Sequence, residues 1–351
     1  MRLPPGEGTS RINMRGDQGQ EISAEKPDIG RRRRLILAWG TLAVNLVVIL
    51  WGAFVRATGS GAGCGNHWPL CNGEIVPRAP ALATVIEFSH RLSSGLALLL
   101  VVGLVVAARG LPRGALYRKA AWVTLGLMLS EALIGAGLVL LEYVADDLSL
   151  ARGWWMSAHL INTFFLMAAL TLSAFFAGRT DSGQTAGQRS NASAPSADST
   201  RQVGVAILAL GAVLMLGVSG AITALGDTLF PVTTLEEGRA LTFSPDAHLF
   251  VRLRVWHPIL ACVVGVIVVL SARVLAWRAT DPLASRFANF LVVTYVLQLL
   301  VGLLNVRLLA PVWIQLLHLL LADLIWILLV LLVARVFWPA TGAPGSSLER
   351  A

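Results

Sequence analysis

The chain contains 351 residues, of which 56% are apolar and only 14% are charged, and its mean hydropathy is +0.70. A soluble globular domain carries about 25% charged residues, so this composition argues against a soluble enzyme and excludes a disordered protein. The net charge of +8 comes from basic residues between long apolar runs, so we expect no nucleic-acid partner. The composition instead predicts an integral membrane protein that contacts lipid. Three cysteines are too few for a disulfide scaffold.

Eight apolar segments reach the length of about 20 residues that a membrane-spanning helix needs. Because these runs are continuous rather than alternating, we expect helices and not the strands of a barrel. The sequence therefore predicts an all-α integral membrane protein with eight transmembrane helices. In chain order the segments are 35–55, 83–108, 120–141, 155–177, 203–225, 255–276, 287–309 and 313–337.

The distribution of lysine and arginine predicts the orientation of these helices. Arg31–Arg34 stand directly before the first segment, and the second, fourth and sixth connections are richer in basic residues than the odd-numbered ones. Because basic loops stay in the cytoplasm, we expect both termini there and the odd connections outside a bacterial plasma membrane. Residues 1–34 would form a polar cytoplasmic arm, 178–202 a flexible linker and 339–351 a cytoplasmic tail.

The two halves of the chain resemble each other, which predicts two pseudo-symmetric four-helix bundles at 35–177 and 203–338. An even number of spans in each repeat keeps both halves in the same orientation. The near-constant offset between matched residues favours duplication. The matches are Gly52 with Gly220, Glu131 with Gln298, Gly135 with Gly302, His90 with His257 and His159 with His318, at offsets of 168, 167, 167, 167 and 159 residues.

Four of the six histidines fall near the predicted outer ends of even-numbered segments, one on each. Ionisable groups inside a membrane are costly, so each is a candidate functional residue. Two imidazoles on facing helices suit bis-axial ligation of a haem iron, whereas zinc needs further ligands that are absent at motif spacing. The alternative is four unrelated histidines that form interhelical hydrogen bonds. The four are His90, His159, His257 and His318, while His67 and His248 are expected to be solvated loop residues.

Three carboxylates lie in or beside the apolar segments. Glu87 precedes His90 by three residues, which places both on one helix face. It is either a proton-transfer group or a helix-start carboxylate that favours the helix dipole. Glu131 and Asp323 are deeper. The match of Glu131 with Gln298 suggests a hydrogen-bonding role, and we expect Asp323 to meet a polar partner across the bundle.

The first outer connection contains Cys64 and Cys71. The outer face of a bacterial membrane permits a disulfide, which would be either a structural staple or a thiol pair that cycles with redox state. Cys262 lies within the sixth segment and is expected to be a small packing residue. Arg91, directly after His90, is a candidate for contact with a haem propionate or for snorkelling to the interface.

Four stretches of the chain, taken in order, carry a family resemblance. They are Gly52-Ala-Phe-Val-Arg-Ala-Thr-Gly-Ser-Gly61, the Cys64…Cys71 loop with Trp68-Pro-Leu, Glu87-Phe-Ser-His90-Arg91, and Leu297-Gln-Leu-Leu-Val-Gly-Leu-Leu-Asn-Val306 followed by Leu317-His318. Together with eight segments and four placed histidines, they resemble the haem A synthase family over roughly residues 35–338.

This resemblance implies an activity, cofactors and partners. The family oxidises a methyl group of haem O to a formyl group, giving haem A for haem-copper terminal oxidases. Haem O synthase and terminal oxidase assembly factors are the expected protein partners, the electron donor is unknown, and a homo-oligomer is left open. The roles implied by similarity are haem O ligation for His90 and His159 with Arg91 beside the substrate, haem b ligation for His257 and His318, catalysis for Glu87, and a disulfide for Cys64 and Cys71.

The second half departs from the family pattern at two positions. Pro258 replaces the arginine that follows His90 in the first half, and Arg254 stands at the position equivalent to Glu87. Propionate recognition in the second half is therefore open, with Arg254 as the candidate substitute. Two rival functions share the histidines: a non-catalytic dihaem membrane cytochrome b, which needs neither Glu87 nor the outer cysteines, and a transporter with histidines as proton relays.

Overall fold

The computed structural model describes residues 29–179, 197–279 and 281–339. Within these residues the chain is helical apart from its connections and one isolated bridge between Cys71 and Glu74. Eight helices are long and apolar enough to cross a membrane, which confirms the predicted all-α architecture. They are α1 (Ile29–Ala57), α2 (Leu82–Ala108), α3 (Leu116–Leu140), α4 (Leu150–Ala177), α5 (Ala197–Leu229), α8 (Trp256–Arg278), α9 (Pro282–Arg307) and α10 (Val312–Phe337), and the shorter helices are η1 (Ser60–Ala62), α6 (Leu235–Phe243), α7 (Leu249–Arg252) and η3 (Leu253–Val255).

Several helices extend beyond the predicted apolar segments. α1 begins at Ile29, so Arg31–Arg34 form its first turns instead of belonging to an arm outside the helix. α5 begins at Ala197, inside the predicted linker, and continues to Leu229. Arginine is a good helix former, so polar turns can prolong a helix past the apolar run that a span requires. The rest of the predicted arm and tail, and most of the linker, lie outside the described residues.

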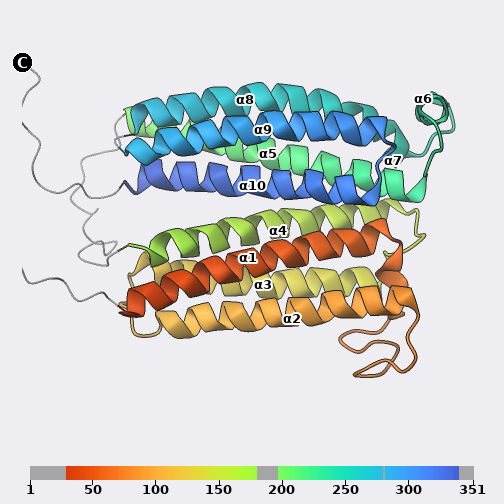
Figure 1. Ribbon diagram of the computed structural model, residues 1–351, viewed down its shortest axis with the longest axis horizontal. Coiled ribbons are helices and arrows are strands. Elements are labelled where there is room, and N and C mark those ends of the chain that lie inside the picture. The colour runs from red at the N-terminus through yellow and green to blue at the C-terminus, as the bar shows by residue number, and fades with distance from the viewer. Residues whose placement is uncertain (1–28, 180–196, 280, 340–351) are drawn as a thin grey trace, which may run out of the picture.

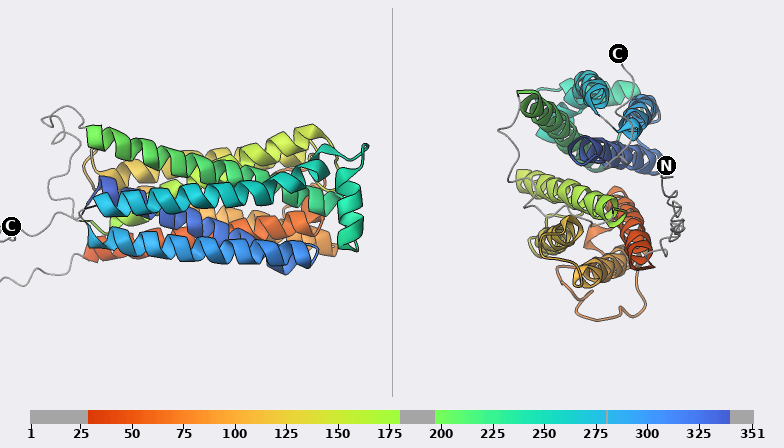
Figure 2. Two further views of the ribbon diagram at one scale, coloured as in Figure 1. Left: turned by 90° about the horizontal axis from the view of Figure 1, so that it is seen from above. Right: turned by 90° about the vertical axis from the view of Figure 1, so that its left-hand side faces the viewer.

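The eight long helices form two groups that lie side by side. Figure 1 shows α1–α4 in one group and α5 with α8–α10 in the other. The end-on view in Figure 2 places α4 and α10 where the two groups meet. α1 and α5 also contact the opposite group. The pseudo-symmetry between the groups stays a prediction from the sequence repeat.

Contacts among α4, α5 and α10 join the two groups. Phe164 of α4 meets Trp326 of α10 edge to face, with ring centroids 4.8 Å apart, and the Trp326 indole N–H donates to the Phe164 carbonyl at 2.8 Å. Gly217 of α5 makes room for the Phe164 ring, because a Cβ there would come within 2.6 Å of it. An edge-to-face aromatic pair contributes about 0.5–1.5 kcal/mol beyond burial, so this cluster orients one group against the other.

Small residues contribute to the buried helix contacts beside larger ones, and many large apolar residues face outward. Without water there is little hydrophobic force between membrane helices, so close backbone approach through small side chains matters more. Ala97 and Ala272 are fully buried, whereas Leu99 and Trp277 are 68% and 81% exposed. Extended exposed apolar surface marks membrane contact, which agrees with the eight apolar helices of a multi-pass membrane protein.

One end of the molecule carries the connections 58–81, 141–149, 230–255 and 308–311, and we call it the α6 end. The sequence prediction missed α6 itself. Thr234 caps this helix by accepting from the Glu237 N–H at 3.1 Å, and a Thr followed three residues later by Glu is a helix-start signal. Hydrogen bonds from the Thr233 backbone and then its side chain hold the pKa of the Glu237 carboxyl below its usual range.

Candidate functional site

Each of the four predicted haem-ligating histidines lies near the α6 end against a glycine of a neighbouring helix. Three of the contacts are so close that a methyl group on the glycine would come within 3.0 Å of the ring, nearer than carbon atoms normally approach. The glycine leaves a flat helix surface for the imidazole. The pairs, with the distance from an ideal Cβ to the ring Cε1, are His90 with Gly52 (2.9 Å), His159 with Gly135 (3.6 Å), His257 with Gly220 (3.0 Å) and His318 with Gly302 (3.0 Å).

These four glycines are site residues whose role the sequence did not reveal. Their matched positions in the two halves were a signal, since Gly52 matches Gly220 and Gly135 matches Gly302. The contact that explains them, however, lies between two different helices. A repeat shows that two positions are equivalent but does not show which side chain faces them.

In the first group of helices, His90 belongs to α2 and His159 to α4. The Nδ1 atoms of both rings are buried and have no hydrogen-bond partner among the described residues. The Glu131 carboxylate of α3 lies beside His159, with 3.6 Å between its Oε1 and the ring Nδ1. That distance lies beyond a hydrogen bond.

In the second group, His257 of α8 and His318 of α10 face each other with ring centroids 6.3 Å apart and ring planes at 80°. The Ser219 hydroxyl lies 2.9 Å from Nδ1 of His257, which leaves Nε2 of that ring for another partner. The Gln298 amide nitrogen lies 3.3 Å from Nε2 of His318. Hydrogen bonds of this kind orient a ligand ring and select its tautomer.

Each histidine pair could hold a metal whose remaining ligands come from a bound prosthetic group and not from the protein. Among the described residues, no group of three or more His, Cys, Asp and Glu side chains could hold a metal ion. A zinc site needs three or four such ligands, whereas two histidines would be enough for a haem iron. Two imidazoles on opposite sides of one metal have ring centroids about 6 Å apart, because each metal–nitrogen bond is about 2 Å. The separation of His257 and His318 agrees with that value.

Glu87 is held beneath the disulfide loop one turn from His90. It is only 4% exposed, its Oε2 accepts from the Cys64 N–H at 2.8 Å, and its Oε1 pairs with Arg91 Nη2 at 2.5 Å. α2 begins at Leu82, so Glu87 lies beyond the first helical turn, and the helix-dipole interpretation does not account for it. The carboxylate connects the loop, the helix and the His90 region.

Arg91 makes four hydrogen bonds within this assembly. Its Nε and Nη2 contact Glu87, and its Nη1 donates to the carbonyls of His67 and Leu70 at 2.7 and 2.6 Å. The predicted contact with a haem propionate stays a prediction, and four of the five guanidinium donors already have partners in the chain. In this structure Arg91 fastens the loop to α2.

The predicted disulfide between Cys64 and Cys71 is present. The loop that it closes is pressed onto the start of α2, because a Cβ on Gly63 would come within 2.4 Å of the Ala83 carbonyl. The Thr84 hydroxyl donates to the Gly63 carbonyl at 2.7 Å. These contacts make the loop a fixed cover over the Glu87 end of α2.

Arg254, the candidate substitute for Arg91, instead caps α5. Its Nε pairs with Asp227 at 2.8 Å, and its Nη2 donates to the carbonyls of Gly226 and Phe230 at 2.6 and 2.9 Å. Asp227 was not recognised from the sequence. Its partner is 27 residues away in the chain, so no local spacing could reveal the pair.

The structure also places four other residues that the sequence singled out, and it corrects the expectation for Cys262. Cys262 is exposed on α8 and does not pack inside the bundle, because that face of the helix points outward. Asp323 is buried, but its Oδ2 has no hydrogen-bond partner among the described residues. His248 lies in a connection, as expected, and is half-buried there, because it caps α7 by accepting from the Phe250 N–H and stacks on Phe230. His67 is exposed, as expected.

Arg56 connects the two groups of helices near the histidines and was missed as a site residue. From α1, its Nη1 donates to the Ala224 carbonyl and the Thr228 hydroxyl of α5, both at 2.7 Å. Its Nη2 donates to the Gln315 side chain of α10 at 3.0 Å. An arginine at the end of an apolar segment was the available signal.

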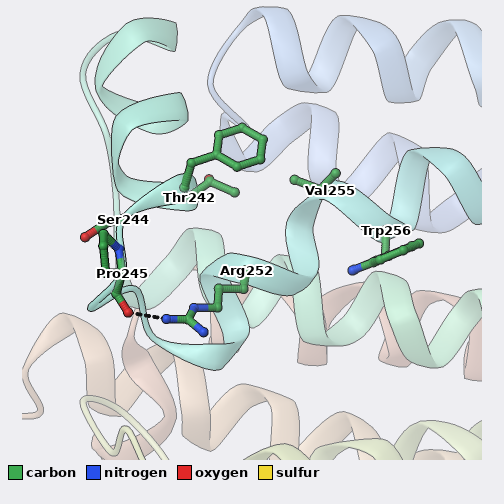
Figure 3. Close-up of a pocket in the computed structure, with 7 residues that line it drawn as sticks. Thr242, Ser244, Pro245, Arg252, Val255 and Trp256 are labelled. Carbon is green, nitrogen blue, oxygen red and sulfur yellow. Dashed lines mark hydrogen bonds between the residues drawn. The ribbon is translucent and has the colours of Figure 1, made fainter.

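An open cavity of about 450 Å³ lies beside α6 and the start of α8. Figure 3 shows Thr242 and Pro245 on one side and Trp256 on the other. The Arg252 guanidinium lies between them and donates a hydrogen bond to the Pro245 carbonyl. Trp256 directly precedes His257, but none of the four histidines lines this cavity. It is therefore a surface feature adjacent to the candidate site.

Comparison with known proteins supports a family for the chain. Residues 35–330 match the COX15-CtaA family model, described as cytochrome oxidase assembly protein. A protein of Thermus thermophilus named "Protoheme IX farnesyltransferase" is 48% identical over 297 residues, which cover 84% of this chain and 47% of that relative. The chain thus spans about half the length of the Thermus relatives that it matches.

Shorter matches connect the chain to proteins named "Heme A synthase". The protein of Alkalihalophilus pseudofirmus is 38% identical over 135 residues, covering 38% of this chain and 44% of the relative. That of Shouchella clausii is 40% identical over 114 residues, covering 32% and 37%. Because the family model covers most of the chain, the protein belongs to the COX15-CtaA family of cytochrome oxidase assembly proteins.

Proposed function

We propose that the protein is a haem A synthase, which oxidises a methyl group of haem O to a formyl group. The observation that carries the proposal is the pair of histidines beside Glu87 under the disulfide loop, together with a second histidine pair that lacks such a carboxylate. Family membership and the matches to proteins named Heme A synthase support it. The rival dihaem cytochrome leaves the buried Glu87 and its loop unexplained.

The chain's own residues divide the work between the two groups of helices. His90 and His159 would hold the substrate haem O, and His257 and His318 would hold haem b. When bound, the iron porphyrins supply the redox chemistry. Glu87 lies one turn from His90 and would take up or release a proton at its carboxylate oxygens. Arg91 holds that carboxylate in place, and the loop closed by Cys64 and Cys71 covers it from water.

The names of the Thermus relatives favour a second candidate, a protohaem IX farnesyltransferase. The match covers only 47% of such a relative, so we assign the farnesyl transfer to the part of those proteins outside the match. A farnesylated haem, the product of that reaction, is then the substrate class for this chain. A haem O synthase is accordingly the expected partner.

Co-expression of the full chain with a haem O synthase tests the proposal. Extracted haems are separated by chromatography and identified by mass, and we expect haem A or its hydroxylated intermediate. Accumulation of haem O alone would overturn the assignment. A parallel culture without the synthase distinguishes the second candidate, because haem O appears there only if this chain transfers the farnesyl group itself.

Glu87→Gln separates catalysis from folding. The variant keeps an oxygen for the Cys64 N–H but loses the charge paired with Arg91, so we expect conversion to stop while haem b stays bound. Glu74→Gln is a matched control, because Glu74 belongs to the same loop and its side chain is 45% exposed. If Glu87→Gln loses all haem, the role of Glu87 is structural.

We also infer that the α6 end faces the outside of a bacterial plasma membrane and that both termini are cytoplasmic. The basic residues at the opposite end, including Arg31–Arg34, support this orientation. The disulfide at the α6 end suits an oxidising compartment. Reporter fusions at Pro112 and Asp246 test it, since only the second should report an external location.

A further inference from the structure

A network of hydrogen bonds holds the Glu131 carboxylate beside His159. The Asn162 amide nitrogen of α4 donates to Oε2 at 2.6 Å, and the Thr163 hydroxyl contacts Oε1. Oε1 is also the oxygen that lies 3.6 Å from Nδ1 of His159. One carboxylate oxygen is thus directed at the ring, and the other is fixed by the helix that carries the ring.

The orientation of Asn162 is determined by its other partners. Its amide nitrogen also donates to the Leu127 carbonyl at 2.9 Å, and its Oδ1 accepts from the Ser130 hydroxyl at 2.7 Å. With its oxygen committed to a donor, the amide can present only its nitrogen to Glu131. The asparagine therefore acts as a donor that favours a negative carboxylate at this position.

The equivalent position in the other group of helices is neutral. Gln298 stands where the repeat places a counterpart of Glu131, and its amide nitrogen lies 3.3 Å from Nε2 of His318. Its Oε1 has no hydrogen-bond partner among the described residues. At this position the two histidine pairs differ by one carboxylate: Glu131 faces Nδ1 of His159, whereas the neutral Gln298 amide faces Nε2 of His318.

We propose that Glu131 is a positioning residue that lowers the reduction potential of the metal bound by His90 and His159 relative to the metal bound by His257 and His318. This inference rests on the proposed haem ligation. When Nε2 of His159 binds a metal, Nδ1 keeps its proton, and a carboxylate beside that N–H makes the imidazole a stronger electron donor. The oxidised metal is stabilised as a result, so electrons are biased toward the second site.

A redox titration of the purified full chain loaded with haemin tests this proposal, followed by the visible spectrum of the reduced haems. In Glu131→Gln we expect the reduction potential of the first site to rise by at least 59 mV. For one electron this equals a tenfold change in the equilibrium between the ferric and ferrous forms. Glu131→Asp keeps the charge and should retain most of the wild-type potential. The reciprocal Gln298→Glu should lower the potential of the second site.

The outcomes separate this inference from the function on which it rests. His159→Ala and His318→Ala should each remove one haem, and if neither does so the proposed ligation fails. If both haems stay bound as bis-histidine complexes and Glu131→Gln leaves the potential of the first site unchanged, the role of Glu131 is overturned. Should Glu131→Gln fail to fold, an unchanged second-site potential in Gln298→Glu overturns the charge argument instead.

Discussion

The contact between each histidine and its glycine makes a sharp prediction, because one of the four pairs provides an internal control. Alanine at Gly220 would place a methyl group 3.0 Å from His257 Cε1, and at Gly302 equally close to His318. Alanine at Gly135 would place it 3.6 Å from His159, an ordinary contact. We expect the first two substitutions to displace their imidazoles and Gly135→Ala to be tolerated.

The expected size of the effect follows from the contact distance. Carbon atoms pack at about 3.5–4.0 Å, so the ring facing Gly220 must move by roughly 0.5 Å or more. A binding constellation tolerates displacements of about 0.5 Å, and overpacking of a filled site costs about 1–3 kcal/mol. Since every 1.4 kcal/mol is tenfold in affinity, haem binding at this site should weaken about 5- to 150-fold.

The measurement is a haemin titration of the purified full-length variants, followed by the absorption band of a bis-histidine haem. Gly220→Ala and Gly302→Ala should lose affinity at the second site only, with the first site unaffected. Equal losses in Gly135→Ala and Gly220→Ala would refute the argument, because the cause would then be the loss of glycine and not the contact with the ring. Unchanged affinity in Gly220→Ala would refute it equally.

Three further predictions concern the contacts that hold the site together. Arg56→Gln removes charged hydrogen bonds from α1 to α5 and α10, so the unfolding free energy in detergent should fall by about 1.5–3 kcal/mol, with a smaller loss in Arg56→Lys. Trp326→Phe deletes one indole hydrogen bond and should cost about 1 kcal/mol, whereas the exposed Trp277→Phe should cost nothing measurable in the same thermal melt. Cys71→Ser opens the loop over Glu87, so the rate of protease cleavage within residues 58–81 should rise about tenfold. If the disulfide is a structural staple, the reduced wild-type protein should be cleaved at the same rate as this variant.

The sequence came close to the fold but placed several helix ends wrongly. Continuous apolar runs predicted all eight long helices, because a chain in lipid must satisfy its backbone hydrogen bonds within each segment. The errors fell at Ile29 and Ala197, where polar residues prolong a helix beyond its apolar run. α6 was missed, because its nine residues are too few for an apolar span, and only the cap at Thr234 marks its start.

The sequence by itself determined which residues stand one per helix near the same end of the bundle, because helix length and chain direction place the four histidines there. Spacing along one helix also put Glu87 and His90 on one face. Only the tertiary structure decided what those side chains touch. Arg91 bonds to the loop, Arg254 caps α5, and Glu131 faces His159. These contacts depend on how each helix is rotated against its neighbours, and packing of the whole bundle sets that rotation.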